Sequence, residues 1–140
     1  MSTPQTGTCL CGACTFTAVP MDNAGACHCG MCRKWSGGMY LSVSCEDVKI
    51  AEGAPIGIYR GSPWGERVFC RECGASLMWR SQDGAHNNVS IQAFEDPSQF
   101  ELEMQLFIDK KPANYALTNQ TKTMTEADVF ALYAPQDDAQ

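Results

Sequence analysis

The chain has 140 residues, the length of one ordinary domain, and its 44% apolar and 19% charged residues are those of a folded globular protein. The net charge of −6 argues against a nucleic-acid-binding protein, because that binding depends on neutralising phosphates. No run approaches the roughly 18 apolar residues of a membrane helix, and the start lacks the basic and apolar regions of a signal peptide. We therefore expect a cytoplasmic protein with no membrane or nucleic-acid partner.

Short runs of alternating apolar and polar residues predict β-strands. In residues 14–19, Cys14, Phe16 and Ala18 share one face. Similar runs, separated by Gly, Pro, Asp and Ser, lie at residues 39–44, 56–60, 76–79 and 89–94. The clearest alternation predicts a strand with two sets of side chains: inward Phe100, Leu102, Met104, Leu106 and Ile108, outward Glu101, Glu103, Gln105 and Phe107.

Helix is scarce in this pattern. Residues 30–36 are expected to form one or two turns, and residues 125–128 (Thr-Glu-Ala-Asp) resemble a capping box that opens a helix through Leu132. Many short strands with few helices predict a mainly antiparallel β protein, a sandwich or open barrel pinned by metal. We expect one domain over residues 1–134, followed by a frayed polar tail over 135–140.

Nine cysteines are unusual for this length, and an odd count without a signal peptide favours metal ligands over a disulfide framework. Cys45 stands alone, and Cys14 lies in the first predicted strand. The other seven form three groups: Cys9 with Cys11; Cys27, Cys29 and Cys32; and Cys70 with Cys73. Zinc takes four such ligands in a tetrahedron, so each group supplies half of a site or more.

Seven cysteines do not divide into two sets of four, which indicates one closed site and one open site. The pairing that leaves the triplet intact joins the first and last groups into a structural zinc site of Cys9, Cys11, Cys70 and Cys73. The triplet Cys27, Cys29 and Cys32 would then bind a second zinc whose fourth position is open. Open zinc sites are typical of catalysis, so these three residues are the catalytic candidates.

Two alternatives compete with this division. Cys14 repeats the spacing of the triplet and could be a ligand, but its phase in the predicted strand favours the core. The triplet could also be closed by His28, His86 or Cys45. His28 stands between two ligands, so its ring is expected to point away from the metal as a hydrogen-bond donor, His86 lies in a solvated turn, and Cys45 is expected at a strand end.

Basic residues gather beside the thiols of this acidic chain. Arg33 and Lys34 follow the triplet, and Arg67 and Arg71 flank Cys70. They either offset the negative charge of zinc bound by several thiolates, which is the favoured interpretation, or hold a substrate carboxylate.

Three segments together resemble the glutathione-dependent formaldehyde-activating enzyme family, which also includes centromere protein V. They are residues 7–12 (GTCLCG), 27–37 (CHCGMCRKWSG) and 67–74 (RVFCRECG), and the resemblance runs from about Gly7 to Tyr115. It implies a β-tent fold shared with a Rab guanine-nucleotide-exchange chaperone. It also implies that Cys9, Cys11, Cys70 and Cys73 bind the structural zinc, and that Cys27, Cys29 and Cys32 bind the zinc at which glutathione engages.

The implied activity is a carbon–sulfur lyase reaction, the reversible addition of glutathione to formaldehyde to give S-hydroxymethylglutathione. The chain departs from the family pattern in its last third, where Ala93 and Glu95 replace a glycine and an aspartate, Gln105 a histidine and Asn114 a tryptophan. The metal ligands are unaffected by these changes. A non-catalytic, zinc-stabilised module that binds glutathione or a protein is the competing function.

Overall fold

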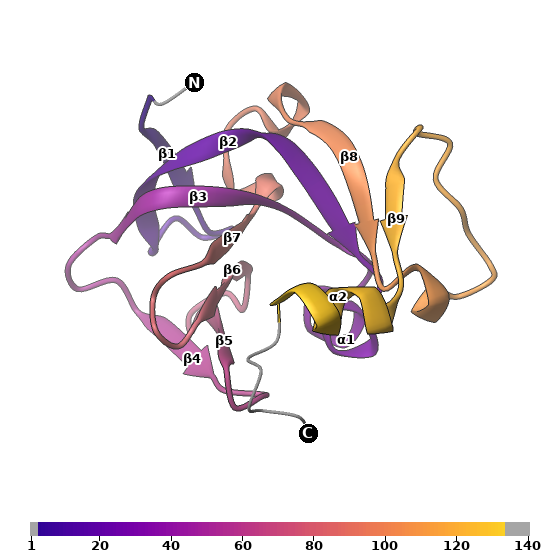
Figure 1. The fold of residues 1–140 in the computed structure, drawn as a ribbon. Coiled ribbons are helices and arrows are strands. Elements are labelled where there is room, and N and C mark those ends of the chain that lie inside the picture. Colours follow the sequence, from indigo (N-terminus) through magenta and orange to yellow (C-terminus); the bar gives the residue numbers. More distant parts are fainter. Residues whose placement is uncertain (1–2, 134–140) are drawn as a thin grey trace. The chain divides into compact units, whose positions relative to one another are not determined.

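The structure is a computed structural model that describes residues 3–133, and it is mainly β, as predicted (Figure 1). Its strands are β1 Gln5–Thr8, β2 Thr15–Cys27, β3 Tyr40–Ile50, β4 Ile56–Tyr59, β5 Gly65–Cys70, β6 Ser76–Ser81, β7 Asn87–Ser90, β8 Glu101–Leu106 and β9 Lys122–Met124. The helices are α1 Gly30–Ser36 and α2 Glu126–Tyr133, with short 3-10 turns η1 Ile91–Ala93, η2 Pro97–Gln99 and η3 Ile108–Lys110. None of these helices is long and apolar enough to cross a membrane.

The chain forms two compact units. Among the described residues, the first unit combines residues 3–24 with Ser42–Glu101, and the second combines Gly25–Leu41 with residues 102–133. The expectation of one domain over residues 1–134 stays a prediction. The tail over 135–140, expected to fray, lies outside the described residues.

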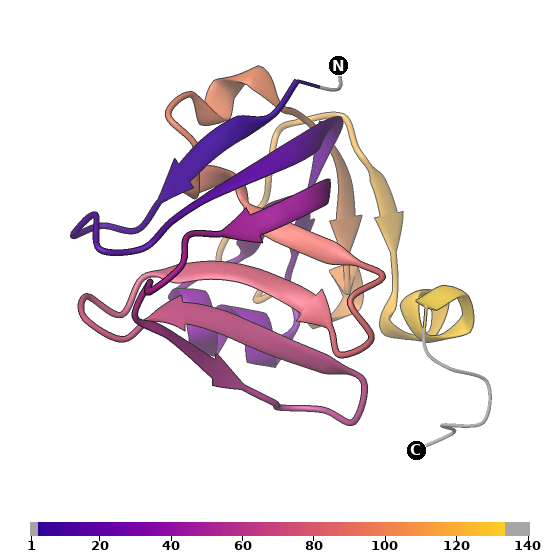
Figure 2. The same cartoon turned by 90° about the vertical axis from the view of Figure 1, so that its left-hand side faces the viewer.

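The first unit is built on antiparallel strands, which lie side by side in Figure 2. The strand order is β4-β5-β6-β7-β3-β2, and β1 pairs with the start of β2. Apolar side chains of these strands form its core, namely Phe16, Ala18, Val43, Val68, Leu77, Met78 and Val89. The predicted strands over residues 14–19, 39–44, 56–60 and 76–79 are thus confirmed, with shifted ends.

Gly7 and Gly57 of this unit lie under aromatic rings of the neighbouring strand. Gly7 pairs with Phe16 and Gly57 pairs with Phe69, and a Cβ atom at either glycine would overlap the partner's ring. The aromatic ring therefore packs directly on the glycine backbone, an arrangement that stabilises glycines within strands.

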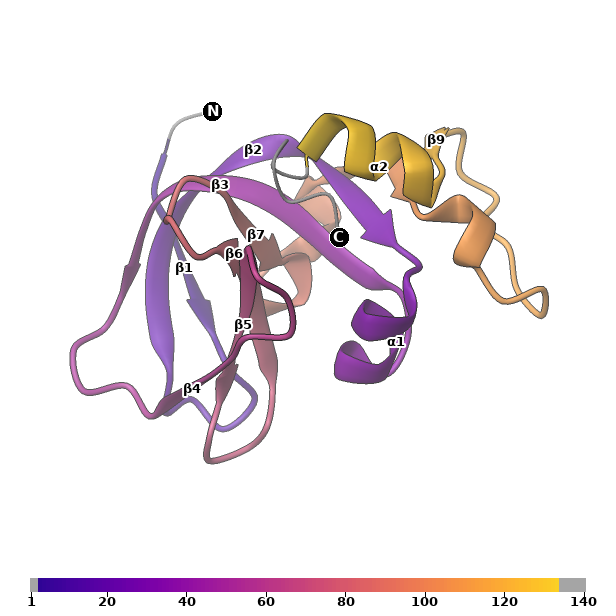
Figure 3. The ribbon, with the colours of Figure 1, turned by 60° about the horizontal axis from the view of Figure 1, so that its bottom comes forward.

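The second unit contains the end of β2, the start of β3, both helices, β9 and all of β8 after Glu101. Figure 3 shows α1 directly after the end of β2 and before β3. The strand pairs of the first unit are mainly antiparallel, as predicted, but β8 and β9 are parallel, so the sheet is mixed. The capping box is confirmed at α2: the Asp128 amide donates to Thr125 Oγ1 (3.2 Å) and the Thr125 amide donates to Asp128 Oδ2 (3.0 Å).

Several other strand boundaries differ from the prediction, and three strands were not predicted. β2 continues to Cys27 through Pro20, Asp22 and Gly25, which sequence rules treat as strand breakers. The run 89–94 leaves the sheet after Ser90 and turns into η1, and β1, β5 and β9 were not predicted at all. In β5, Glu66 and Arg67 interrupt the apolar pattern, yet both are buried.

The orientation predicted for β8 is wrong at Gln105. This residue was expected on the outward face, but it is the most buried residue of the strand, while Leu102, Met104 and Leu106 are only half-buried. The Gln105 amide forms hydrogen bonds with His28 and Thr121 inside the second unit, and these bonds favour the inward orientation over the one that the apolar alternation predicts.

Candidate metal centres

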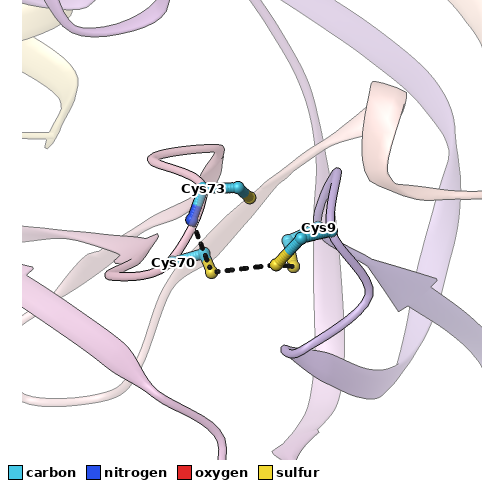
Figure 4. Close-up of side chains that lie close together, drawn as sticks. Cys9, Cys70 and Cys73 are labelled. Atoms are coloured by element: carbon cyan, nitrogen blue, oxygen red, sulfur yellow. Dashed lines mark hydrogen bonds between the residues drawn. The ribbon is translucent and has the colours of Figure 1, made fainter.

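The first candidate centre lies in the first unit and joins two loops. Cys9 and Cys11 lie in the turn between β1 and β2, Cys70 ends β5, and Cys73 lies in the turn that follows. All four Sγ atoms lie within 4.8 Å of one another, and Figure 4 shows Cys9 facing Cys70 and Cys73. The structure therefore brings together the four residues predicted to form the closed site.

The spacing of these sulfur atoms fits a tetrahedral zinc ion. Zinc–sulfur bonds of about 2.3 Å place tetrahedral sulfur atoms about 3.8 Å apart. The Sγ atoms of Cys9 and Cys11 are 3.6 Å apart, and those of Cys11 and Cys70 are 3.9 Å apart. The donor set and its geometry thus suit zinc.

Backbone amides surround this cluster and favour thiolates. Cys70 Sγ accepts hydrogen bonds from the amides of Glu72 (3.3 Å) and Cys73 (3.4 Å), and Cys9 Sγ accepts one from the Cys14 amide (3.3 Å). Burial alone raises the pKa of Cys9, but the Cys14 amide and the neighbouring thiols lower it to about 6. Gly74 allows the second turn, since its φ of 80° is left-handed.

The second candidate centre lies in the second unit at the start of α1. Cys27 is the last residue of β2, Cys29 caps the N-terminus of α1, and Cys32 lies in its first turn, with the three Sγ atoms within 4.8 Å of one another. The Cys32 amide donates to Cys29 Sγ (3.3 Å). Because Cys29 and Cys32 hydrogen-bond its thiol and burial adds to their effect, the pKa of Cys27 is raised.

This cluster offers three ligands. Among the described residues of its unit, no histidine nitrogen or carboxylate oxygen joins the three thiols. His28, one of the residues considered as a fourth ligand, is fully buried with both ring nitrogens engaged elsewhere: Nδ1 lies 2.9 Å from the Tyr115 hydroxyl and Nε2 lies 2.8 Å from Gln105 Oε1. The prediction that its ring is a hydrogen-bonding group rather than a ligand agrees with this geometry.

The hydrogen bonds around His28 favour one tautomer of its neutral ring. Gln105 Nε2 donates to Thr121 Oγ1 (2.8 Å), so the amide turns its oxygen toward His28, whose Nε2 must then carry a proton. In the neutral ring Nδ1 is consequently the acceptor, and Tyr115 donates its hydroxyl proton to it. A single chain of hydrogen bonds links Thr121, Gln105, His28 and Tyr115.

The backbone of His28 is held as firmly as its ring. Its amide donates to the Leu106 carbonyl (3.0 Å), and its own carbonyl accepts a hydrogen bond from Arg33 Nε (2.9 Å). Because His28 links Cys27 to Cys29, these contacts fix the peptide that sets the distance between two of the thiols.

The remaining residues singled out in the sequence belong to neither thiol cluster. Cys14 is fully buried, as expected of a core residue, and His86 is exposed. Cys45 was expected at a strand end but lies inside β3, where its thiol donates to the Val43 carbonyl (3.6 Å) and burial raises its pKa to about 12. Arg67 is buried, in contrast to the exposed Arg71.

Sequence reasoning missed the residues that hold His28. Tyr115 and Thr121 lie in the irregular segment after η3, where no periodicity marks a residue as structural. Gln105 carried a usable signal, because it is the one uncharged polar residue among the outward positions of its run. A neutral amide there is as typical of a buried hydrogen-bonding group as of an exposed one.

Comparisons with known proteins agree with the cysteine pattern. The chain is 29% identical over 127 residues to an uncharacterised lyase of Schizosaccharomyces pombe, a match that spans 89% of this chain and 93% of that protein. A crystal structure of a Rhodobacter sphaeroides protein has a similar fold, with a TM-score of 0.56 and 22% identity over 64% of this chain and 87% of that one. Residues 4–110 match the family described as glutathione-dependent formaldehyde-activating enzyme. Both candidate metal centres fall within that range, and the chain belongs to this family.

Proposed function

We propose that the protein is a zinc-dependent carbon–sulfur lyase that joins glutathione to a small aldehyde, with formaldehyde as the expected substrate. In the forward direction the thiol sulfur forms a bond to the carbonyl carbon. The carbon–oxygen π bond breaks, and the oxygen takes up the proton that the thiol loses, which gives S-hydroxymethylglutathione. The family membership and the lyase name of the yeast relative support this class of reaction.

The observation that carries the proposal is the unequal number of donors in the two clusters. Cys9, Cys11, Cys70 and Cys73 can fill a tetrahedron, whereas Cys27, Cys29 and Cys32 leave one position for a ligand from outside. Bound zinc supplies at that position a positive centre that favours the thiolate form of a substrate thiol. The chain's own part is to hold the three thiols at one point, with the His28 peptide fixed between two of them.

The proposal includes the zinc ligands themselves and the setting of the protein. The four-cysteine site is proposed to be structural and the three-cysteine site catalytic. A β-tent fold, a single domain over residues 1–134 and a cytoplasmic location complete the proposal. Glutathione, abundant in the cytoplasm, suits that location.

The first test is native mass spectrometry of the purified protein with and without glutathione, followed by turnover measurements with glutathione and formaldehyde. We expect two zinc ions and one glutathione per chain, and a rate above the uncatalysed reaction. Cys29→Ser is the decisive variant, because serine still caps a helix and so preserves α1 while removing a thiolate. We expect it to keep one zinc and lose turnover.

Cys45→Ser is the matched control, since Cys45 belongs to neither cluster. It should keep two zinc ions and full activity. Turnover that survives Cys29→Ser would contradict the catalytic assignment. Glutathione binding with no rate above background would instead favour the binding module.

A further inference from the structure

We propose that Arg33 binds a carboxylate of the thiol substrate that engages the Cys27, Cys29 and Cys32 cluster. This inference rests on the proposed function and deepens it: it predicts that the site selects thiols with a carboxylate group, as glutathione has, over simple thiols.

The position of Arg33 follows from the geometry of α1. Arg33 lies four residues after Cys29, so the two side chains share one face of the helix, and its amide donates to the Cys29 carbonyl (3.0 Å). The side chain folds back toward the helix start, where Nε donates to the His28 carbonyl (2.9 Å). The guanidinium is therefore held at the peptide that joins two of the thiols.

The anchor of this guanidinium is itself rigid. The His28 ring is hydrogen-bonded on both sides, by Gln105 and Tyr115, and the His28 amide is bonded to Leu106. A guanidinium fixed through Nε on a rigid carbonyl loses little further freedom when it binds a ligand, which is the condition for strong recognition.

The outer nitrogens of Arg33 have no carboxylate partner among the described residues. Arg60 and Arg80, by contrast, each form an ion pair with Glu66 in the other unit. Nη2 of Arg33 lies 3.7 Å from the point where a Cβ on Gly30 would lie, so the guanidinium reaches the first turn of α1. Because residue 30 is glycine, no side chain there covers the guanidinium. The side chain is half-buried.

This arrangement suits a carboxylate better than charge compensation alone. A general positive charge near thiolates needs no defined orientation, and the exposed Lys34 would supply one. An arginine fixed through Nε presents its outer N–H groups in a fixed plane, the geometry that matches the two oxygens of a carboxylate. Glutathione carries two carboxylates on the residues that flank its thiol-bearing cysteine.

The test compares two thiols in two variants. Turnover with formaldehyde is measured for glutathione and for 2-mercaptoethanol, which lacks a carboxylate, in the wild type, Arg33→Gln and the matched control Lys34→Gln. We expect Arg33→Gln to lower kcat/KM for glutathione by about 10- to 100-fold, the loss of a charged hydrogen-bonded contact. Arg33→Gln also removes the Nε contact with the His28 carbonyl, so the rate with 2-mercaptoethanol is expected to fall as well, but by clearly less than the rate with glutathione. Lys34→Gln should affect neither thiol.

Calorimetric titration of the zinc-loaded proteins with glutathione gives a readout that does not depend on turnover. Arg33→Gln should bind glutathione about 10- to 100-fold more weakly than the wild type at unchanged zinc content. If Arg33→Gln does not fold, Arg33→Lys replaces it. Lysine keeps the charge but not the planar fork, and it should recover only part of the affinity.

Three outcomes would overturn the inference. An equal fall in rate with both thiols would show that Arg33 serves the zinc site in general, and unchanged glutathione affinity in Arg33→Gln would exclude a contact. A full recovery in Arg33→Lys would show that charge alone is needed. Failure of the proposed function looks different: the wild type would then bind glutathione, with its affinity dependent on Arg33, but would not turn it over.

Discussion

The imidazole Nε2 of His28 lies 2.8 Å from Oε1 of Gln105, and this hydrogen bond joins positions 77 residues apart in a fully buried setting. It explains why β8 places a polar side chain inward and why His28, although set between two candidate zinc ligands, turns its ring away from them. The thiol cluster thus has a polar support that is separate from any metal.

Removing the Gln105 amide should destabilise the second unit. In Gln105→Leu the His28 N–H and the Thr121 hydroxyl lose their partner, and an unsatisfied buried polar group costs about 1–3 kcal/mol. We expect the free energy of unfolding in urea to fall by that amount. Glu101→Gln, an exposed change on the same strand, should stay within about 0.5 kcal/mol of the wild type. A Gln105→Leu protein as stable as this control would show that the hydrogen bond is not formed in solution.

Loss of one thiol from the four-cysteine site should affect stability more than the matching loss from the triplet. Cys73→Ser should remove one zinc and lower the melting temperature by on the order of 10 °C or more, since this ion would join two loops far apart in the sequence. Cys29→Ser should lower it by less, because its three cysteines lie within six residues. Differential scanning calorimetry with zinc analysis checks this order, and the reverse order would assign the structural role to the triplet.

The stability of the first unit should depend on pH through Glu66. Its carboxylate accepts hydrogen bonds from Arg80 Nε (2.6 Å) and Arg60 Nε (2.9 Å). Burial by itself raises the pKa of Glu66, but Arg80 and, after it, Arg60 hold it below the ordinary range. Because the folded-state pKa is the lower one, this group stabilises the fold above the unfolded pKa of about 4.3, and the contribution is lost as the pH falls through the folded value.

Glu66→Gln isolates that contribution. At pH 7 it should lower the free energy of unfolding by about 1.5–3 kcal/mol, and the difference from the wild type should shrink below about pH 4. Zinc release at low pH affects both proteins and cancels in the difference. Arg80→Met should cost more than Arg60→Met, because the Arg80 side chain is 25% exposed and that of Arg60 63%. If the difference in unfolding free energy between the wild type and Glu66→Gln grew as the pH fell, the pKa of Glu66 would be raised in the folded protein, not lowered.

A methyl group on Gly57 should destabilise the first unit by overlap with the Phe69 ring. We expect Gly57→Ala to cost about 1–3 kcal/mol in urea unfolding, the usual range for overpacking. Gly38→Ala is the matched control, since a Cβ there meets nothing within 4 Å. Equal stability of the two variants would mean that the ring moves aside freely.

The sequence by itself determined the elements whose signals are local. Spacing marked the three cysteine groups, because ligands that share a turn must lie close together, whereas their division into sets of four and three came from a count of ligands. Alternation found most of the strands around the first-unit core, and the Thr125 and Asp128 pair marked the start of α2. Each of these signals depends on residues within a few positions of one another.

Only the tertiary structure decided what depends on distant partners. The inward turn of Gln105 needs His28 and Thr121, the burial of Glu66 needs Arg80, and the parallel pairing of β8 with β9 follows a long irregular connection. The hydrogen bond from Arg33 to the His28 carbonyl joins residues that are close in sequence. His28 itself, however, is held by distant residues, namely Leu106, Gln105 and Tyr115. Buried polar groups take the orientation that satisfies their hydrogen bonds, and those partners are known only once the chain has folded.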